Sequence, residues 1–166
     1  MDISAKNIVS RWLLYISFAA AFPILCWAEK SQNGQVLRVI DGDTITIITD
    51  SQQSQKIRLS EIDTPERDQP WGQQASQVLS RKVLKKSIVA KASGVDRYDR
   101  VIAEIFVGGR NINHEMVAEG HAWAYRRYLK NHRLLELERI AKENGLGLWG
   151  FSTDPIPPWL WRKGTR

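Results

Sequence analysis

Short β-branched runs separated by polar turns form the most regular pattern in the sequence. Valine, isoleucine and threonine favour strands, whereas glycine, asparagine, aspartate and serine favour the turns between them. The polar segment 50–55 joins two of these runs as a hairpin loop, and Gly108-Gly109 forms the tip of a later hairpin. The pattern predicts strands at residues 35–40, 44–49, 56–62 and 87–92 and in the hairpin 101–112, after a polar lead at 29–34.

Apolar residues recur at helical spacing between and after these strands. Residues 74–86 and 132–144 each carry an apolar stripe with a repeat of three to four residues. Asn113 is placed to cap a shorter helix that runs to Glu119 and ends at Gly120. Five strands interrupted by one helix and followed by two more predict an α+β fold, a five-stranded OB-type β-barrel with three helices.

The first 28 residues are expected to be a signal peptide and not part of the fold. An uncharged run over residues 12–28 ends in Cys26-Trp27-Ala28, which has small residues at the −3 and −1 positions of a signal-peptidase site. Pro23 and the modest length argue against a permanent transmembrane helix, and an uncleaved anchor is the alternative. We expect cleavage after Ala28, a secreted or periplasmic protein, and membrane contact only through the signal peptide.

The mature chain is expected to hold one domain, because 166 residues favour a single domain and no repeat or boundary interrupts the pattern. Residues 29–151 form that domain, and the Pro- and Trp-rich basic stretch 152–166 is expected to lie as a tail on the surface. The formal net charge of +6 suits nucleic acid or an acidic membrane surface, and simple solubility is the other interpretation. The single cysteine leaves with the signal peptide, which excludes disulfides, Cys-based zinc centres and cysteine nucleophiles from the mature protein.

Acidic residues gather at the ends of two neighbouring predicted strands. If the strands on either side of loop 50–55 pair as a hairpin, Asp43 at the start of one and Asp63 at the end of the other lie at the same edge. Two close carboxylates repel each other unless a proton or cation lies between them, and an all-oxygen site selects Ca²⁺ or Mg²⁺ over zinc. Each acidic stretch taken alone could equally be an ordinary turn. The prediction of a cation site therefore depends on both acids lying at the same edge of the hairpin.

Two arginines extend this prediction toward phosphate chemistry. Arg58 interrupts an otherwise apolar strand five residues before Asp63, and Arg100 stands where a charged turn enters the next strand. Each is equally a surface residue when taken alone. Together with a cation, two guanidinium groups can hold a phosphodiester and stabilise the extra negative charge of its transition state.

Three motifs in this order resemble the staphylococcal nuclease (thermonuclease) family. They are 41–44 (DGDT), 58–66 (RLSEIDTPE) and 96–100 (DRYDR), and the later 145–149 (GLGLW) is similar to the family's closing helix and tryptophan. The resemblance covers roughly residues 36–149. It implies an OB barrel capped by three helices, which agrees with the fold that the pattern predicts.

The resemblance also implies roles for individual residues. Asp43, Asp63 and the backbone carbonyl of Thr64 would hold Ca²⁺, and Glu66 would act as general base or organise the attacking water. The remaining roles implied are phosphate binding by Arg58 and Arg100, gripping of a terminal phosphate by Arg97 and Tyr98, and base stacking by Tyr125, with Tyr128 as the alternative.

The activity implied is a secreted, Ca²⁺-dependent endonuclease that cleaves the 5′ P–O bond of DNA or RNA and leaves 3′-phosphates, with no obligate protein partner. A non-catalytic OB-fold nucleic-acid-binding protein is the alternative. Asp99 departs from the family, which often has glycine there, and it could pair with Arg100 and weaken phosphate binding or simply lie in the turn. Arg126 and Arg127 beside the tyrosines suit single-stranded nucleic acid, or else form a solvated basic face. The three histidines receive no role.

Overall fold

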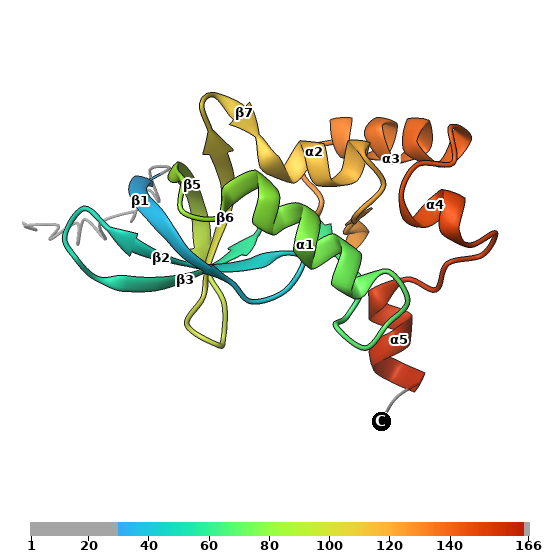
Figure 1. The fold of residues 1–166 in the computed structure, drawn as a ribbon, viewed down its shortest axis with the longest axis horizontal. Helices are drawn as coiled ribbons and strands as arrows, with labels where there is room; N and C mark the ends of the chain where they lie inside the picture. Colours follow the sequence, from blue (N-terminus) through green and yellow to red (C-terminus); the bar gives the residue numbers. More distant parts are fainter. Residues whose placement is uncertain (1–29, 165–166) are drawn as a thin grey trace, which may run out of the picture.

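Five strands close into a barrel in the computed structural model, which describes residues 30–164 (Figure 1). Neighbouring strands pair antiparallel except β3 and β6, which pair in parallel and close the sheet on itself. This confirms the predicted α+β, five-stranded OB-type architecture. The barrel strands are β1 (Lys30–Val39), β2 (Thr44–Thr49), β3 (Ser54–Leu59), β5 (Ser87–Val95) and β6 (Val101–Val107).

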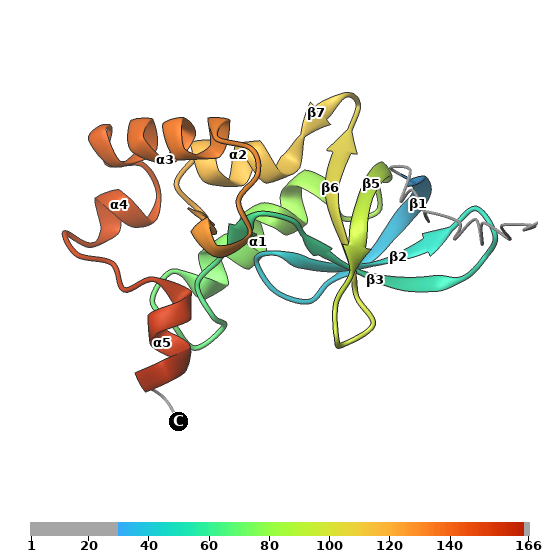
Figure 2. The ribbon, with the colours of Figure 1, turned by 180° about the vertical axis from the view of Figure 1, so that it is seen from behind.

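Helices gather at one end of the barrel, as the two opposite views show (Figures 1 and 2). The three predicted helices are α1 (Gly72–Val83), α2 (Ile112–Ala118) and α3 (Arg133–Glu143). The described chain adds a 3-10 helix at Arg126–Tyr128, two short helices, α4 (Leu148–Phe151) and α5 (Pro158–Gly164), and the two-residue strands β4 (Ile62–Asp63), β7 (Arg110–Asn111) and β8 (Trp123–Ala124).

Alternation along the strands builds the core as predicted. Ile45, Ile47, Ile57 and Leu59 point into the barrel and are almost completely buried, whereas Arg58 lies on the other face. Residues from α1, α2 and α3 cover the open end of the same core. The barrel is therefore a packed interior, and functional side chains have to lie at its rim or on its outer face.

Two local predictions were wrong. The polar lead is not outside the sheet: β1 begins at Lys30 and pairs with β5 from Lys30 to Gln35, because backbone hydrogen bonds need no apolar side chains. The cap of α2 is Asn111, whose side chain accepts a hydrogen bond from the His114 amide at 3.1 Å. Asn113 is buried inside that helix and bonds the backbone of β6.

The signal peptide predicted for residues 1–28, with its cleavage site, lies outside the described residues. Among residues 30–164, no helix combines the length and the apolar character needed to cross a membrane. The stretch 152–166, which was expected as a surface tail, contains α5 over most of its second half. Figure 1 places α5 next to the loop that precedes α1.

Candidate active site

Asp43 and Asp63 meet at one guanidinium group. The β2–β3 register pairs Thr44 with Arg58, so the start of β2 lies beside the end of β3, as the hairpin prediction requires. Nη2 of Arg58 is 3.0 Å from Oδ2 of Asp43 and 3.0 Å from Oδ1 of Asp63. The structure therefore brings both predicted metal ligands and the first predicted phosphate-binding arginine together.

Arg58 is held by more than the two acids. Its Nη1 donates to the carbonyl oxygens of Leu59 at 2.8 Å and Ile62 at 3.0 Å, across a turn in which Glu61 has a φ of 62°. The Arg58 side chain is only 15% exposed. In this state it neutralises two buried acids and closes the turn that leads into β4.

Thr64 fixes the orientation of the Asp43 carboxylate. Its amide and hydroxyl both donate to Oδ2 of Asp43, at 3.1 and 3.0 Å, and the hydroxyl of Thr44 donates to Oδ1 at 3.1 Å. Gly42 allows this close approach, because a Cβ at that position would lie 2.6 Å from Oγ1 of Thr64. Asp43 is thus positioned by the two turns that the sequence singles out.

Burial shifts two acids at this rim, Asp41 and Asp63, toward protonation. Burial raises the pKa of Asp41 to about 6, and the negative charge of Asp43 adds to the effect. Burial also raises the pKa of Asp63, against which a hydrogen bond from Arg162 and the charge of Arg58 act only in part. A bound proton is therefore favoured on these two acids in the folded protein.

Arg162 of α5 completes the cluster, and sequence reasoning missed it. Its Nη2 lies 2.7 Å from Oδ2 of Asp63, and its Nη1 lies 2.5 Å from Oε1 of Glu66 and 3.3 Å from Oδ1 of Asp63. The Glu66 side chain is 38% exposed, so water can reach it. No spacing or periodicity links position 162 to these acids, and the Pro- and Trp-rich composition around it suggested only a tail.

Gln69 anchors the loop that carries Glu66. Its side-chain oxygen accepts from the Glu66 amide at 3.0 Å, and its side-chain nitrogen donates to the carbonyl of Ile156 at 2.5 Å. Gln69 is buried. The loop bearing the predicted general base is therefore tied both to itself and to the C-terminal segment.

The turn between β5 and β6 assembles the predicted phosphate-gripping residues around Asp96. The Asp96 carboxylate accepts from the amides of Tyr98 and Arg100 and pairs with the Arg100 guanidinium, with Nη2 at 2.7 Å. Burial raises the pKa of Asp96, but the hydrogen bonds from Arg100 and Tyr98 outweigh it and leave the pKa below its ordinary value. Asp99 adopts a φ of 59°, the left-handed conformation that glycine favours, and within the described chain Arg100 pairs with Asp96 and not with Asp99.

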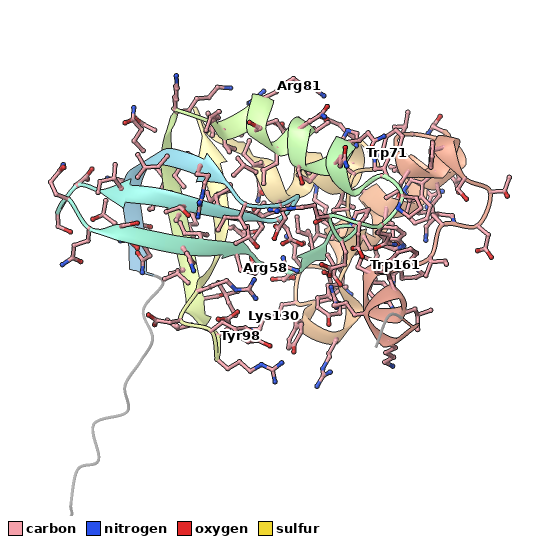
Figure 3. The ribbon with its side chains drawn as sticks, turned by 60° about the horizontal axis from the view of Figure 1, so that its bottom comes forward. Arg58, Trp71, Arg81, Tyr98, Lys130 and Trp161 are labelled. Carbon is pink, nitrogen blue, oxygen red and sulfur yellow. The ribbon has the colours of Figure 1, made fainter. Side chains whose placement is uncertain are left out.

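Arg97 and Tyr98 form a basic–aromatic pair near this turn. The Arg97 guanidinium lies over the Tyr98 ring at 4.7 Å and donates to its hydroxyl at 2.6 Å, and Tyr98 is largely exposed. Figure 3 shows Tyr98 on a loop at the edge of the molecule and Arg58 further in. The parallel register places Arg58 opposite Ile102, and Arg100 comes directly before β6 begins at Val101, so both arginines belong to the neighbourhood where β3 and β6 pair.

Tyr125 lies in an aromatic group next to α5. Its ring stacks on Trp159 with centroids 5.6 Å apart and planes 6° apart, and Tyr128 meets it edge-on at 5.0 Å. Glu61 holds this loop: its carbonyl accepts from the Tyr125 amide at 2.7 Å, and its carboxylate accepts from the amides of Lys130 and Asn131. Glu61 is a positioning residue that the sequence alone did not reveal.

Arg126 is an ion-pair partner of a buried acid. Its guanidinium pairs with the buried Glu138, with Nη1 2.8 Å from Oε1, and Lys142 binds the same carboxylate. Burial raises the pKa of Glu138, but the hydrogen bonds from Arg126 and Lys142 outweigh it and leave that pKa lowered. The pair stabilises α3 against β8, and the Arg126 side chain is still 50% exposed on the loop beside the tyrosines.

The donor set at the rim fits a hard cation. Asp43, Asp63 and Thr64 offer oxygen atoms only, and oxygen ligands are those that Ca²⁺ prefers. The described residues contain no group of three or more His, Cys, Asp or Glu side chains arranged around one ion position. The protein therefore offers two carboxylates and a backbone oxygen, and water would complete the ligands of an ion. In this structure, guanidinium groups bind the two carboxylates.

Comparison with known proteins places this chain in a family. The sequence model described as "Staphylococcal nuclease homologue" matches residues 56–150. An "Uncharacterized endonuclease" of Haemophilus influenzae is 37% identical over 156 residues, which cover 93% of this chain and 87% of the relative. A protein of the same description from Escherichia coli is 35% identical, with 92% and 97% covered, and a "Micrococcal nuclease" of Shigella flexneri is 37% identical, with 84% of each covered. The chain belongs to the staphylococcal nuclease homologue family.

Proposed function

We propose that this protein is a secreted or periplasmic, Ca²⁺-dependent endonuclease that hydrolyses phosphodiester bonds of DNA, RNA or both. The observation that carries the proposal is the convergence of Asp43 and Asp63 on Arg58, with Glu66 joined to the same cluster. Relatives named as endonucleases and as a micrococcal nuclease support the nuclease activity. The expected products are 3′-phosphate ends from cleavage of the 5′ P–O bond.

Each protein group has a defined task in this reaction. Glu66, on an anchored loop and open to water, accepts a proton from the attacking water or orients it. Arg58 and Arg100 offer guanidinium forks to the non-bridging phosphate oxygens. A bound Ca²⁺ would supply further positive charge to the phosphate as a Lewis acid, and Asp43, Asp63 and the Thr64 carbonyl would hold it.

Substrate binding extends the site in two directions. Arg97 and Tyr98 lie on the exposed turn beside Arg100, where a terminal phosphate could be gripped. Tyr125 offers a flat ring of the kind on which bases of single-stranded nucleic acid stack. The formal net charge of +6 supports a polyanionic substrate.

A non-catalytic nucleic-acid-binding protein is the competing proposal. Such a protein needs the barrel and the basic turn but has no use for a general base or a buried acid pair. Asp43, Asp63, Glu66, Arg58 and Arg100 are all present, which favours the enzyme.

Digestion of plasmid DNA and of RNA by residues 29–166, with Ca²⁺ or with a chelator, tests the proposal. We expect cleavage in Ca²⁺, none in chelator, and 3′-phosphates by end-group analysis. Binding of both nucleic acids without cleavage under any condition would favour the non-catalytic protein, and full activity in chelator would remove the metal from the mechanism.

A further inference from the structure

The C-terminal segment, residues 152–164, contacts the site at three separate points. The carbonyl of Ile156 accepts from Gln69, which anchors the Glu66 loop. Trp159 stacks on Tyr125 and meets the buried Trp123 edge-on, with centroids 6.5 Å apart. Arg162 pairs with Asp63 and Glu66. The segment therefore borders the site at its loop, its aromatic side and its acids.

Arg162 uses the same oxygen atoms that a catalytic cation needs. It binds both carboxylate oxygens of Asp63, and Arg58 shares one of them. Asp63 is 1% exposed, so its carboxylate has no free face toward solvent. The remaining hydrogen bond of Arg162 goes to Glu66 and covers one oxygen of the carboxylate that is proposed to act on water. A cation and Arg162 therefore cannot both bind Asp63 in this arrangement.

The charges of the cluster allow a cation to take the place of Arg162. Asp43, Asp63 and Glu66 carry three formal negative charges, and Arg58 and Arg162 carry two positive ones. Withdrawal of Arg162 removes one positive charge from Asp63 and Glu66, and a divalent cation would more than replace it.

We infer that α5 is a built-in competitor of the catalytic cation: Arg162 occupies Asp63 and Glu66 in the ion-free protein and leaves them when the ion binds. The inference rests on the proposed function, because it uses the ion position assigned there. By linkage, docking of α5 weakens ion binding and ion binding weakens docking of α5 to the same extent.

Trp159 couples this exchange to the substrate side of the site. Its ring lies parallel to Tyr125 and covers one face of the side chain proposed to stack on a base. Trp159 and Arg162 belong to the same short helix, α5. Release of α5 therefore frees the Asp63 carboxylate and one face of Tyr125 in a single step.

Calorimetric titration with Ca²⁺ of the mature chain and two variants tests the inference. Arg162→Ala removes the competing guanidinium, and Lys163→Ala is the matched control, because it removes the same charge from an exposed position one residue further along α5. We expect Arg162→Ala to bind Ca²⁺ about 5- to 150-fold more tightly than the unmodified chain, the usual range of coupling between two sites. Lys163→Ala should change the affinity less than twofold.

Amide hydrogen exchange gives a second readout that does not depend on the affinity. The amides of Leu160 and Trp161 bond the Pro157 carbonyl at 2.9 and 3.0 Å, so they should be protected while α5 is docked. Adding Ca²⁺ should accelerate their exchange in the unmodified chain, and Arg162→Ala should show fast exchange without Ca²⁺.

The possible outcomes separate the inference from the proposed function. Equal or weaker Ca²⁺ binding by Arg162→Ala, with unchanged exchange in α5, would overturn the competition while leaving a Ca²⁺-dependent enzyme in place. Absence of Ca²⁺ binding in all three proteins, together with nuclease activity in chelator, would overturn the metal assignment and the competition with it.

Discussion

Replacing Arg58 by alanine should destabilise the domain strongly, because Arg58 is the shared partner of two buried acids. Breaking a buried ion pair by removing one partner costs about 3–5 kcal/mol, since the other charge stays buried without compensation. Asp43 is 6% exposed and Asp63 is 1% exposed, so neither carboxylate can turn to water. Arg162 still binds Asp63 in the variant, which places the expected loss near the lower end, about 3 kcal/mol.

The assay is urea unfolding of residues 29–166 in chelator, so that divalent ions do not contribute. A loss of this size corresponds to a fall of roughly 10 °C in melting temperature for a domain of this length. Arg97→Ala is the matched control, since Arg97 is exposed on a turn and its loss should cost less than about 0.5 kcal/mol. Arg58→Lys should be intermediate in stability and severely impaired in turnover, because an ammonium group cannot replace the guanidinium fork.

The pH dependence of the same variant provides a sharper check. The charge of Arg58 lowers the pKa of Asp63 against the effect of burial, so its removal raises that pKa further and favours the protonated form in the folded state. Stability linked to a raised pKa is present at low pH and is lost as the pH rises. The loss in free energy of unfolding that Arg58→Ala causes should therefore be smaller at pH 5 than at pH 7. A loss in free energy of unfolding below 1 kcal/mol at pH 7, or a loss that grows toward pH 5, would refute the assignment of Arg58 as the partner of Asp43 and Asp63.

Three further predictions concern the base, the rim and the barrel. Glu66→Gln should lower turnover about 10²–10⁴-fold in a plasmid-digestion assay and leave the unfolding midpoint nearly unchanged; wild-type turnover would exclude the water-activating role. The pKa of Asp41 is raised to about 6, so part of the free energy of unfolding should be lost as the pH rises from about 4 to 6. Asp41→Asn should remove this part of the pH dependence in urea unfolding in chelator, and an unchanged pH profile would contradict the prediction. Asn113→Ala should cost about 2–4 kcal/mol in the same unfolding assay, because the buried Ile105 amide and Ser60 carbonyl lose their hydrogen bonds to the Asn113 side chain, and a loss below 1 kcal/mol would show that water replaces them.

The barrel and the meeting of Asp43 with Asp63 were predictable from local patterns. β-branched runs on both sides of the polar loop 50–55 indicated a hairpin, and the pairing of Thr44 with Arg58 follows once that hairpin forms. Register then brings the two acids to one edge. The motif resemblance added the individual roles, which stay predictions until they are measured.

Other parts of the site could not be predicted because they depend on contacts between distant positions. Arg162 lies 99 residues from Asp63, and neither periodicity nor spacing connects them. Arg126 has basic and aromatic neighbours in the sequence, and only the fold shows that it also pairs with the buried Glu138 of α3. Asn111 and Asn113 are equally good caps by residue type, and only the docking of α2 against β6 decides which of them enters the core.

The most direct test of the account is a Ca²⁺ titration of the mature chain beside Asp43→Asn and Asp63→Asn. If both acids face one ion, the unmodified chain should bind a single Ca²⁺ at this rim, and each substitution should weaken that binding at least about tenfold, because asparagine keeps one oxygen but loses the charge. Equal Ca²⁺ affinity in all three proteins would contradict the shared ion site on which the proposed chemistry depends.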